Sequence, residues 1–106
     1  MLPLDLLTPS EIARLLAERA RTLRLQRGWT QQEIAARSGL TLPTYRRFER
    51  TGQISLDRLL KVAVVLDARA GFDQIFALPP AQSLAELAER TQHSTRKRGR
   101  RHLADD

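Results

Sequence analysis

The sequence predicts an all-α fold, and three observations support that prediction. A threonine or serine precedes a glutamate by three residues at Thr8 and Glu11, at Thr30 and Glu33, and at Ser83 and Glu86, the pattern of a helix-starting capping box. Apolar residues after these caps recur at helical spacing, and they nowhere alternate with polar residues as in a half-buried strand. With 106 residues, the chain has room for one small domain and a tail.

The first helix is expected from Pro9 to Arg27. Thr8 is its cap, and Pro9 suits the first helical position, where a backbone donor is not needed. Gly28 supplies the left-handed turn that ends the helix. Its apolar residues at helical spacing are Ile12, Leu15, Leu16, Ala20 and Leu23.

A second and a third helix follow with little chain between them. The second is expected from Gln31 to Ser38, and the segment Gly39-Leu40-Thr41 separates it from the third. Thr41 caps the third helix, which starts at Leu42 and is closed by Gly52. Both helices are short because a glycine ends each of them.

Two further helices complete the predicted domain. Ser55 caps the fourth helix, whose apolar face consists of Leu56, Leu59, Leu60, Ala63 and Leu66. A short fifth helix is expected over 71–76, with Phe72, Ile75 and Phe76 closing the core. A last brief helix after Ser83 places Leu84, Leu87 and Ala88 on one side.

These elements predict four regions. We expect an N-terminal extension over 1–8, a helical domain over 9–78, a short C-terminal helix over 79–93 and a disordered basic tail over 94–106. The apolar stripe of the C-terminal helix either folds onto the domain or meets a partner, and the sequence leaves both readings open.

The charge is concentrated in one block and the tail. The net charge is +6, and arginine supplies every cation except Lys61 and Lys97. Residues 14–50 have nine arginines against three glutamates, a net charge of +6, and residues 94–106 have five cations against two aspartates, a net charge of +3. The planar guanidinium suits phosphates and guanine edges, so a nucleic acid is the expected partner.

Other classes of protein are disfavoured. The chain has no cysteine, its predicted core has no histidine, and it has no glycine-rich phosphate loop, so we expect no enzyme, no cofactor and no metal site. His93 and His102 are expected to be solvated. The longest uncharged run, 12 residues over 74–85, is too short to cross a bilayer, so we expect no membrane span and a cytoplasmic location.

The second and third helices predict a DNA-binding device. Two short helices joined by a glycine-containing three-residue turn are typical of a helix-turn-helix, whose second helix enters the major groove. Tyr45 and Phe48, three residues apart, are expected to face inward. The residues left for the groove or its rims are Leu42, Pro43, Thr44, Arg46, Arg47 and Arg50.

The chain resembles the Cro/C1 (XRE) helix-turn-helix family over about residues 12–76, in three segments: Gly28-Trp29-Thr30-Gln31-Gln32-Glu33-Ile34-Ala35, Ser38-Gly39-Leu40-Thr41 and Phe48-Glu49-Arg50. The resemblance implies a five-helix, lambda-repressor-like domain. The opening from Leu7 to Ile12, with the stretch from Gln26 to Gln31, is similar to HipB-type antitoxins. Such antitoxins repress their own operon and bind a HipA-type kinase toxin.

The resemblance also implies roles for particular residues. Gln31 contacts a phosphate together with the helix amino terminus, and Arg24 forms a structural ion pair with Glu49. Leu42, Pro43 and Thr44 lie against base edges, with Arg47 one turn further on. The Leu-Pro pair favours thymine methyl groups and shape readout, while Arg46 and Arg47 favour guanine or phosphate. The expected interface also includes Gln32, Thr41 and Arg50.

Several alternatives stay open. Trp29 suits core packing better than base stacking, and the Tyr45 hydroxyl either stays with the core or reaches a phosphate. The tail is a minor-groove arm, a nonspecific anchor or a solubilising end, with its cations at Arg96, Lys97, Arg98, Arg100 and Arg101.

The predicted function is that of a homodimeric repressor on a palindromic operator in the nucleoid, acting as a HipB-like antitoxin with a HipA-like toxin partner. A stand-alone regulator without a toxin and a nonspecific nucleic-acid adaptor are the alternatives.

Overall fold

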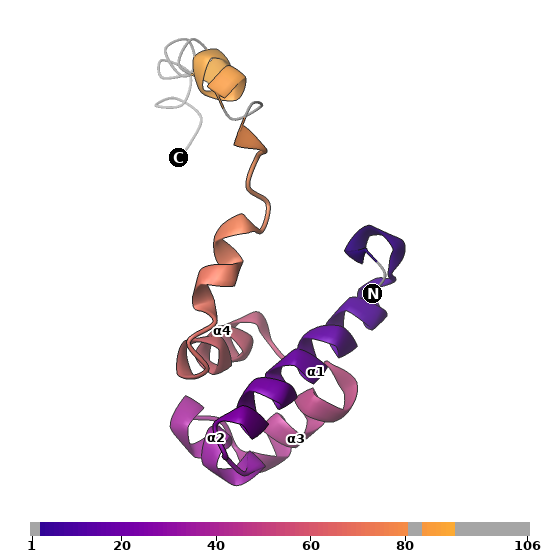
Figure 1. Cartoon of the computed structure of the whole chain (residues 1–106), viewed down its shortest axis with the longest axis vertical. Coiled ribbons are helices and arrows are strands. Elements are labelled where there is room, and N and C mark those ends of the chain that lie inside the picture. The colour runs from indigo at the N-terminus through magenta and orange to yellow at the C-terminus, as the bar shows by residue number, and fades with distance from the viewer. Residues whose placement is uncertain (1–2, 81–83, 91–106) are drawn as a thin grey trace, which may run out of the picture. The chain divides into compact units, whose positions relative to one another are not determined.

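The computed structural model describes residues 3–80 and 84–90, and every regular element in these ranges is a helix (Figure 1). The prediction of an all-α fold is confirmed. The elements are the 3-10 helix η1 (Leu4–Leu6), the α-helices α1 (Pro9–Gln26), α2 (Gln31–Ser38), α3 (Leu42–Thr51) and α4 (Leu56–Val65), and the 3-10 helix η2 (Arg69–Gln74).

The helix starts follow the predicted caps. The hydroxyl of Thr8 accepts from the backbone N–H of Glu11 at 3.1 Å, and the Glu11 carboxylate accepts from the N–H of Thr8 at 2.8 Å. Thr30 and Glu33 form the same reciprocal pair at the start of α2. These contacts satisfy backbone donors that a helix start otherwise leaves without a partner.

The core joins all four α-helices. α1 packs against α3, and α2 contacts both α3 and α4 (Figure 1). The largest fully buried side chains are those of Tyr45, Phe48, Ile34 and Val62. The remaining members of the cluster are Ala17, Ala20, Ala35, Leu40 and Leu66. The apolar side chains that α1 buries in this core are small, those of Ala17 and Ala20.

A glycine sets the distance between α1 and α3. Gly52, the C-cap of α3, has φ +81°, in the left-handed region that favours glycine. A Cβ atom at this position would lie 2.6 Å from the backbone carbonyl carbon of Ala13 in α1. The end of α3 therefore touches the α1 backbone with no space for a side chain.

The predicted fifth helix is only partly correct. The chain forms the 3-10 helix η2 instead, and Phe72 is half-buried. Ile75 is 51% exposed and Phe76 fully exposed, so the prediction that they close the core is wrong. The physical reason is local: η2 ends at Gln74, and Phe76 takes a left-handed φ of 63°, a turn rather than a continuing helix.

The chain divides into two compact units, residues 1–73 and 74–106. In the second unit, residues 84–90 are helical, and the side chains of Leu84 and Leu87 are exposed. The predicted cap Ser83 and the predicted basic tail lie outside the described residues. No helix among the described residues is long and apolar enough to span a membrane.

The contact between Gly52 and Ala13 predicts unequal effects of two alanine substitutions. Gly39→Ala is the control, because Gly39 also has a left-handed φ but has open space around it. We expect Gly39→Ala to lower the free energy of unfolding by about 1 to 2 kcal/mol. Gly52→Ala should lower the free energy of unfolding by at least about 1 kcal/mol more than Gly39→Ala does, because α1 must move to make room for the added Cβ atom. Urea denaturation followed by circular dichroism measures both, and equal losses would contradict the described packing.

Candidate nucleic-acid interface

The turn between α2 and α3 is fixed at each of its residues. Gly39 ends α2 with a left-handed φ of 73°. Leu40 is buried, and its N–H donates to the carbonyl of Ala35 at 2.9 Å. The Thr41 hydroxyl accepts from the N–H of Thr44 and so caps α3. α3 is therefore held in one orientation relative to α2, as a helix-turn-helix requires.

α3 has one buried and one exposed face. Tyr45 and Phe48 are buried as predicted, and their rings meet edge to face with centroids 5.9 Å apart. The opposite face exposes Arg46, Arg47 and Arg50 to solvent. α3 thus presents a row of guanidinium groups on a helix whose other face is locked into the core.

A buried ion pair links α3 to α1. Arg24 Nε donates to Glu49 Oε2 at 2.7 Å and Arg24 Nη2 to Glu49 Oε1 at 3.1 Å, while both side chains are more than nine-tenths buried. The third nitrogen, Nη1, donates to the carbonyl oxygen of Trp29 at 2.8 Å. The bidentate pair matches the fork geometry of arginine to that of carboxylate. It is the pair that the family resemblance implied.

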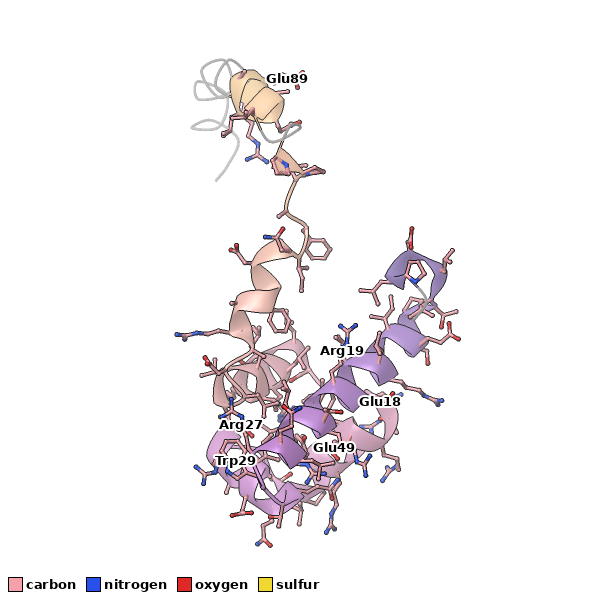
Figure 2. All side chains as sticks on the ribbon, in the orientation of Figure 1. Glu18, Arg19, Arg27, Trp29, Glu49 and Glu89 are labelled. Carbon is pink, nitrogen blue, oxygen red and sulfur yellow. The ribbon has the colours of Figure 1, made fainter. Side chains whose placement is uncertain are left out.

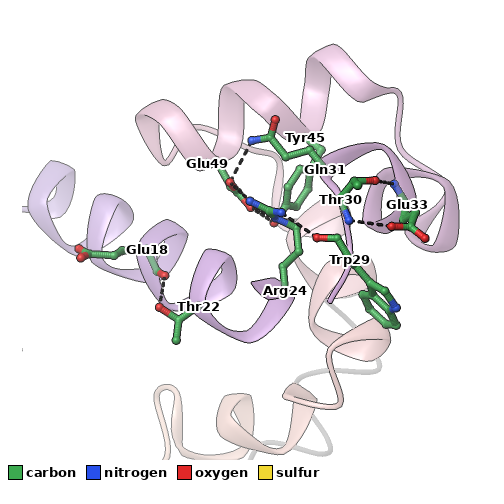
Figure 3. A network of polar contacts seen from close by, with 9 residues as sticks. All are labelled: Glu18, Thr22, Arg24, Trp29, Thr30, Gln31, Glu33, Tyr45 and Glu49. Atoms are coloured by element: carbon green, nitrogen blue, oxygen red, sulfur yellow. Dashed lines mark hydrogen bonds and ion pairs between the residues drawn. The ribbon is translucent and has the colours of Figure 1, made fainter. Parts of the chain in front are cut away.

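Two further side chains complete this polar network (Figure 3). Gln31 Nε2 at the start of α2 donates to Glu49 Oε1 at 3.0 Å, and the Tyr45 hydroxyl donates to Glu49 Oε2. The Glu49 carboxylate therefore accepts hydrogen bonds from α1, α2 and its own helix. No buried side-chain polar atom among the described residues lacks a hydrogen-bond partner.

The network determines the charge states of its members. Burial opposes ionisation of Glu49, but the hydrogen bonds from Arg24, Tyr45 and Gln31 outweigh it and lower the pKa of its carboxyl group. Burial, together with the hydrogen bond to Glu49, raises the pKa of the Tyr45 hydroxyl. At neutral pH the site is therefore an ionised carboxylate surrounded by donors.

The structure brings most of the predicted contact residues to the start of α2 and to the turn and helix that follow. The exposed ones are Gln32, Thr41, Pro43, Arg46, Arg47 and Arg50, and the half-buried ones are Gln31, Leu42 and Thr44. Gln31 differs from its expected role in one respect, because its amide nitrogen donates to Glu49. That nitrogen has a second hydrogen, which suits a phosphate oxygen. The tail cations lie outside the described residues.

Trp29 is a packing residue, as the sequence favoured. It lies half-buried against the core, and Figure 2 shows it beside Arg27. The guanidinium carbons of Arg27 and Arg37 lie 5.3 Å and 4.4 Å from the ring centroid. Arg27 also donates to the carbonyl of Leu66 at the end of α4, so these cations have structural contacts.

The sequence pattern gives no indication of a role for Gln53. Its side-chain oxygen accepts a hydrogen bond from Nη2 of Arg47. Both residues line a hollow of about 210 Å³ between α3 and the start of α4, together with Thr44, Ile54, Ser55 and Arg58. No residue spacing predicts this contact, because it depends on the path of the chain after Gly52.

Part of the chain matches a known protein family. Residues 21–70 match the model of a helix-turn-helix family, and this range includes α2, the turn, α3 and α4. No curated protein and no solved structure matches the chain. The matched range contains every residue of the Glu49 network.

The buried ion pair predicts a large loss of stability on truncation. Arg24→Ala leaves Glu49 buried without its main partner, and we expect the free energy of unfolding to fall by about 3 to 5 kcal/mol. Arg21→Ala, an exposed arginine on the same helix, is the matched control and should change it by at most about 0.5 kcal/mol. Urea denaturation followed by circular dichroism compares them. An Arg24→Ala protein as stable as the control would show that the ion pair does not stabilise the fold.

The lowered pKa of Glu49 predicts a pH dependence. Because this pKa is lower in the folded protein than its ordinary value of 4.5, the stability that Glu49 contributes is complete above about pH 4.5. It is lost as the pH falls through the lower, folded value. Glu49→Gln should therefore be less stable than the wild type at pH 7 but lose less stability on acidification to about pH 3. Melting temperatures across this range test it, and parallel curves for the two proteins would contradict it.

Proposed function

Because the chain belongs to the Cro/C1-type (XRE) helix-turn-helix family of DNA-binding regulators, we propose that it is a sequence-specific repressor that controls its own operon. The main supporting observation is the division of α3 into two faces. Tyr45, Phe48 and Glu49 anchor the helix, which leaves the three arginines of its other face for DNA. Such a repressor acts at the chromosome, so the proposed location is the cytoplasm, at the nucleoid.

The contacts are assigned by side-chain chemistry. Leu42, Pro43 and Thr44 open α3 and suit thymine methyl groups and the shape of the groove. Arg46 and Arg47 suit guanine edges or phosphates. The side chain of Gln31 and the amino terminus of α2 suit a phosphate, whose negative charge is favoured there. This division separates residues that read sequence from residues that position the domain.

We further propose a homodimer on a palindromic operator, with half-sites about one helical turn apart. A single small domain contacts few base pairs, and a two-fold axis doubles the contacts. Support comes from α4, where three exposed apolar side chains recur every fourth residue, Leu56 at 68%, Leu60 at 38% and Val64 at 52%. Light scattering measures the mass of the protein with and without operator DNA. We expect the mass of two chains for the protein bound to the operator. A single chain in both states would contradict the dimer.

We also propose a more specific role for this repressor, that of a HipB-like antitoxin bound by a HipA-like kinase toxin. Its support is the resemblance of the segment from Leu7 to Gln31 to such antitoxins. A regulator without a toxin has the same DNA-binding domain, and co-purification with the product of the neighbouring gene separates the two. Failure to bind that product would leave the stand-alone regulator.

The test of sequence-specific repression is a fluorescence-anisotropy titration. The probes are the DNA upstream of the protein's own gene and a shuffled copy of it, each at low and physiological salt. We expect a preference of about a thousandfold or more for the upstream DNA, retained at physiological salt. Equal binding to both probes that collapses with salt would indicate phosphate contacts alone and favour a nonspecific adaptor.

A further inference from the structure

Arg47 differs from its neighbours on α3 in having a side-chain partner. Its Nη2 donates to Oε1 of Gln53, whereas Arg46 and Arg50 have no hydrogen bond or ion pair from their side chains within the described part of the chain. The contact is between two exposed residues, one on α3 and one beyond its end. It therefore fixes a group on the surface rather than in the core.

The backbone around Gln53 holds this contact in place. The Thr51 hydroxyl donates to the carbonyl oxygen of Arg47 at 2.7 Å, and the N–H of Gln53 donates to the same hydroxyl at 3.0 Å. Gly52 between them is tightly packed against Ala13. Gln53 is thus connected to Arg47 in two ways, by its own side chain and, through its backbone N–H, by the Thr51 hydroxyl.

The chemistry of the pair selects a ligand. Arginine has donors only, and the carboxamide oxygen of Gln53, its one side-chain acceptor group, faces the guanidinium. The Gln53 amide nitrogen and the remaining arginine N–H groups are therefore what the pair offers outward. A surface of donors matches guanine, whose major-groove edge has the acceptors N7 and O6, and it opposes the amino groups of adenine and cytosine.

The pair also lies on the side of α3 expected to face bases. Arg47 and Gln53 line the same hollow as Thr44, one turn earlier on α3. Thr44 is among the residues assigned to base edges. Arg47 follows about one turn later on α3, so a base that contacts Thr44 is close to the pair.

We propose that Gln53 is a positioning residue for Arg47 and that this pair requires a guanine at one position of each operator half-site. The inference rests on the proposed function, because it assumes that α3 binds in the major groove. Gln53 orients the guanidinium toward N7 and O6 of the guanine, and the prior ordering of both side chains reduces the entropy lost on binding.

The experiment begins with selection of binding sites from random duplex DNA by the wild-type protein. Each selected guanine is then replaced in turn by 7-deazaguanine, which lacks the N7 acceptor. We expect one position per half-site at which the wild type loses about tenfold to a hundredfold in affinity. Arg47→Ala should be insensitive to the replacement at that position.

The variant that isolates Gln53 is Gln53→Met, which has a similar length but cannot hold the guanidinium. It should lose most of the preference for guanine over 7-deazaguanine at that one position and keep the wild-type preferences at every other position. It should bind shuffled DNA like the wild type. Arg50→Ala is the control, since this arginine is exposed on the same helix and has no hydrogen bond to Gln53. It should weaken binding to all DNA without changing the base preference. Circular dichroism of each variant verifies that it is folded.

Three outcomes would overturn the proposal. The first is that Gln53→Met keeps the full preference for guanine over 7-deazaguanine at the position where Arg47→Ala loses it. That result would show that Gln53 does not position the arginine. Selected sites in which no guanine is sensitive to the replacement would show that the pair does not read this base. Selection of no sequence at all by the wild type would instead refute the proposed function, and the inference with it.

Discussion

The structure depends on one buried carboxylate. Glu49 accepts hydrogen bonds from Arg24 on α1, Gln31 on α2 and Tyr45 on its own helix, and Arg24 is further bound to the carbonyl of Trp29. A buried charge is tolerated only when its partners satisfy it, so each of these elements has one position relative to α3. The network therefore determines the angle at which α3 leaves the turn, and this angle is what a DNA-reading helix must keep constant.

Because few residues anchor α3, this short helix both packs into the core and presents arginines to solvent. In ten residues, α3 commits Tyr45 and Phe48 to the apolar core and Glu49 to the network. Gly52 then lets its end lie directly against α1. The three arginines on its other face are exposed, so they add positive charge without the cost of burying a charged group. A change of the residues proposed to read bases should accordingly alter sequence preference while it leaves the fold intact.

Much of the fold follows from local chemistry and is predictable. Thr8 with Glu11, Thr30 with Glu33, and the glycines that end α2 and α3 define helix boundaries through contacts within a few residues, and Tyr45 and Phe48 follow from helical spacing. Contacts that form across a turn of the chain do not follow from residue spacing. The donation from Gln31 to Glu49 and that from Arg47 to Gln53 arise only when the turns have placed these side chains together. The exposure of Ile75 and Phe76 likewise depends on where a 3-10 helix ends, which spacing does not determine.

We propose that α3, fixed by the Glu49 network, enters the major groove of specific DNA. The most direct measurement is a two-dimensional amide NMR titration of the labelled protein with an operator duplex selected by it. If α3 enters the groove, the largest shifts occur at the amides of residues 31–32, 41–42 and 44–50, while the buried amides of α1 keep their positions. Shifts confined to the basic residues 94–106, with α3 unchanged at saturation, would contradict it.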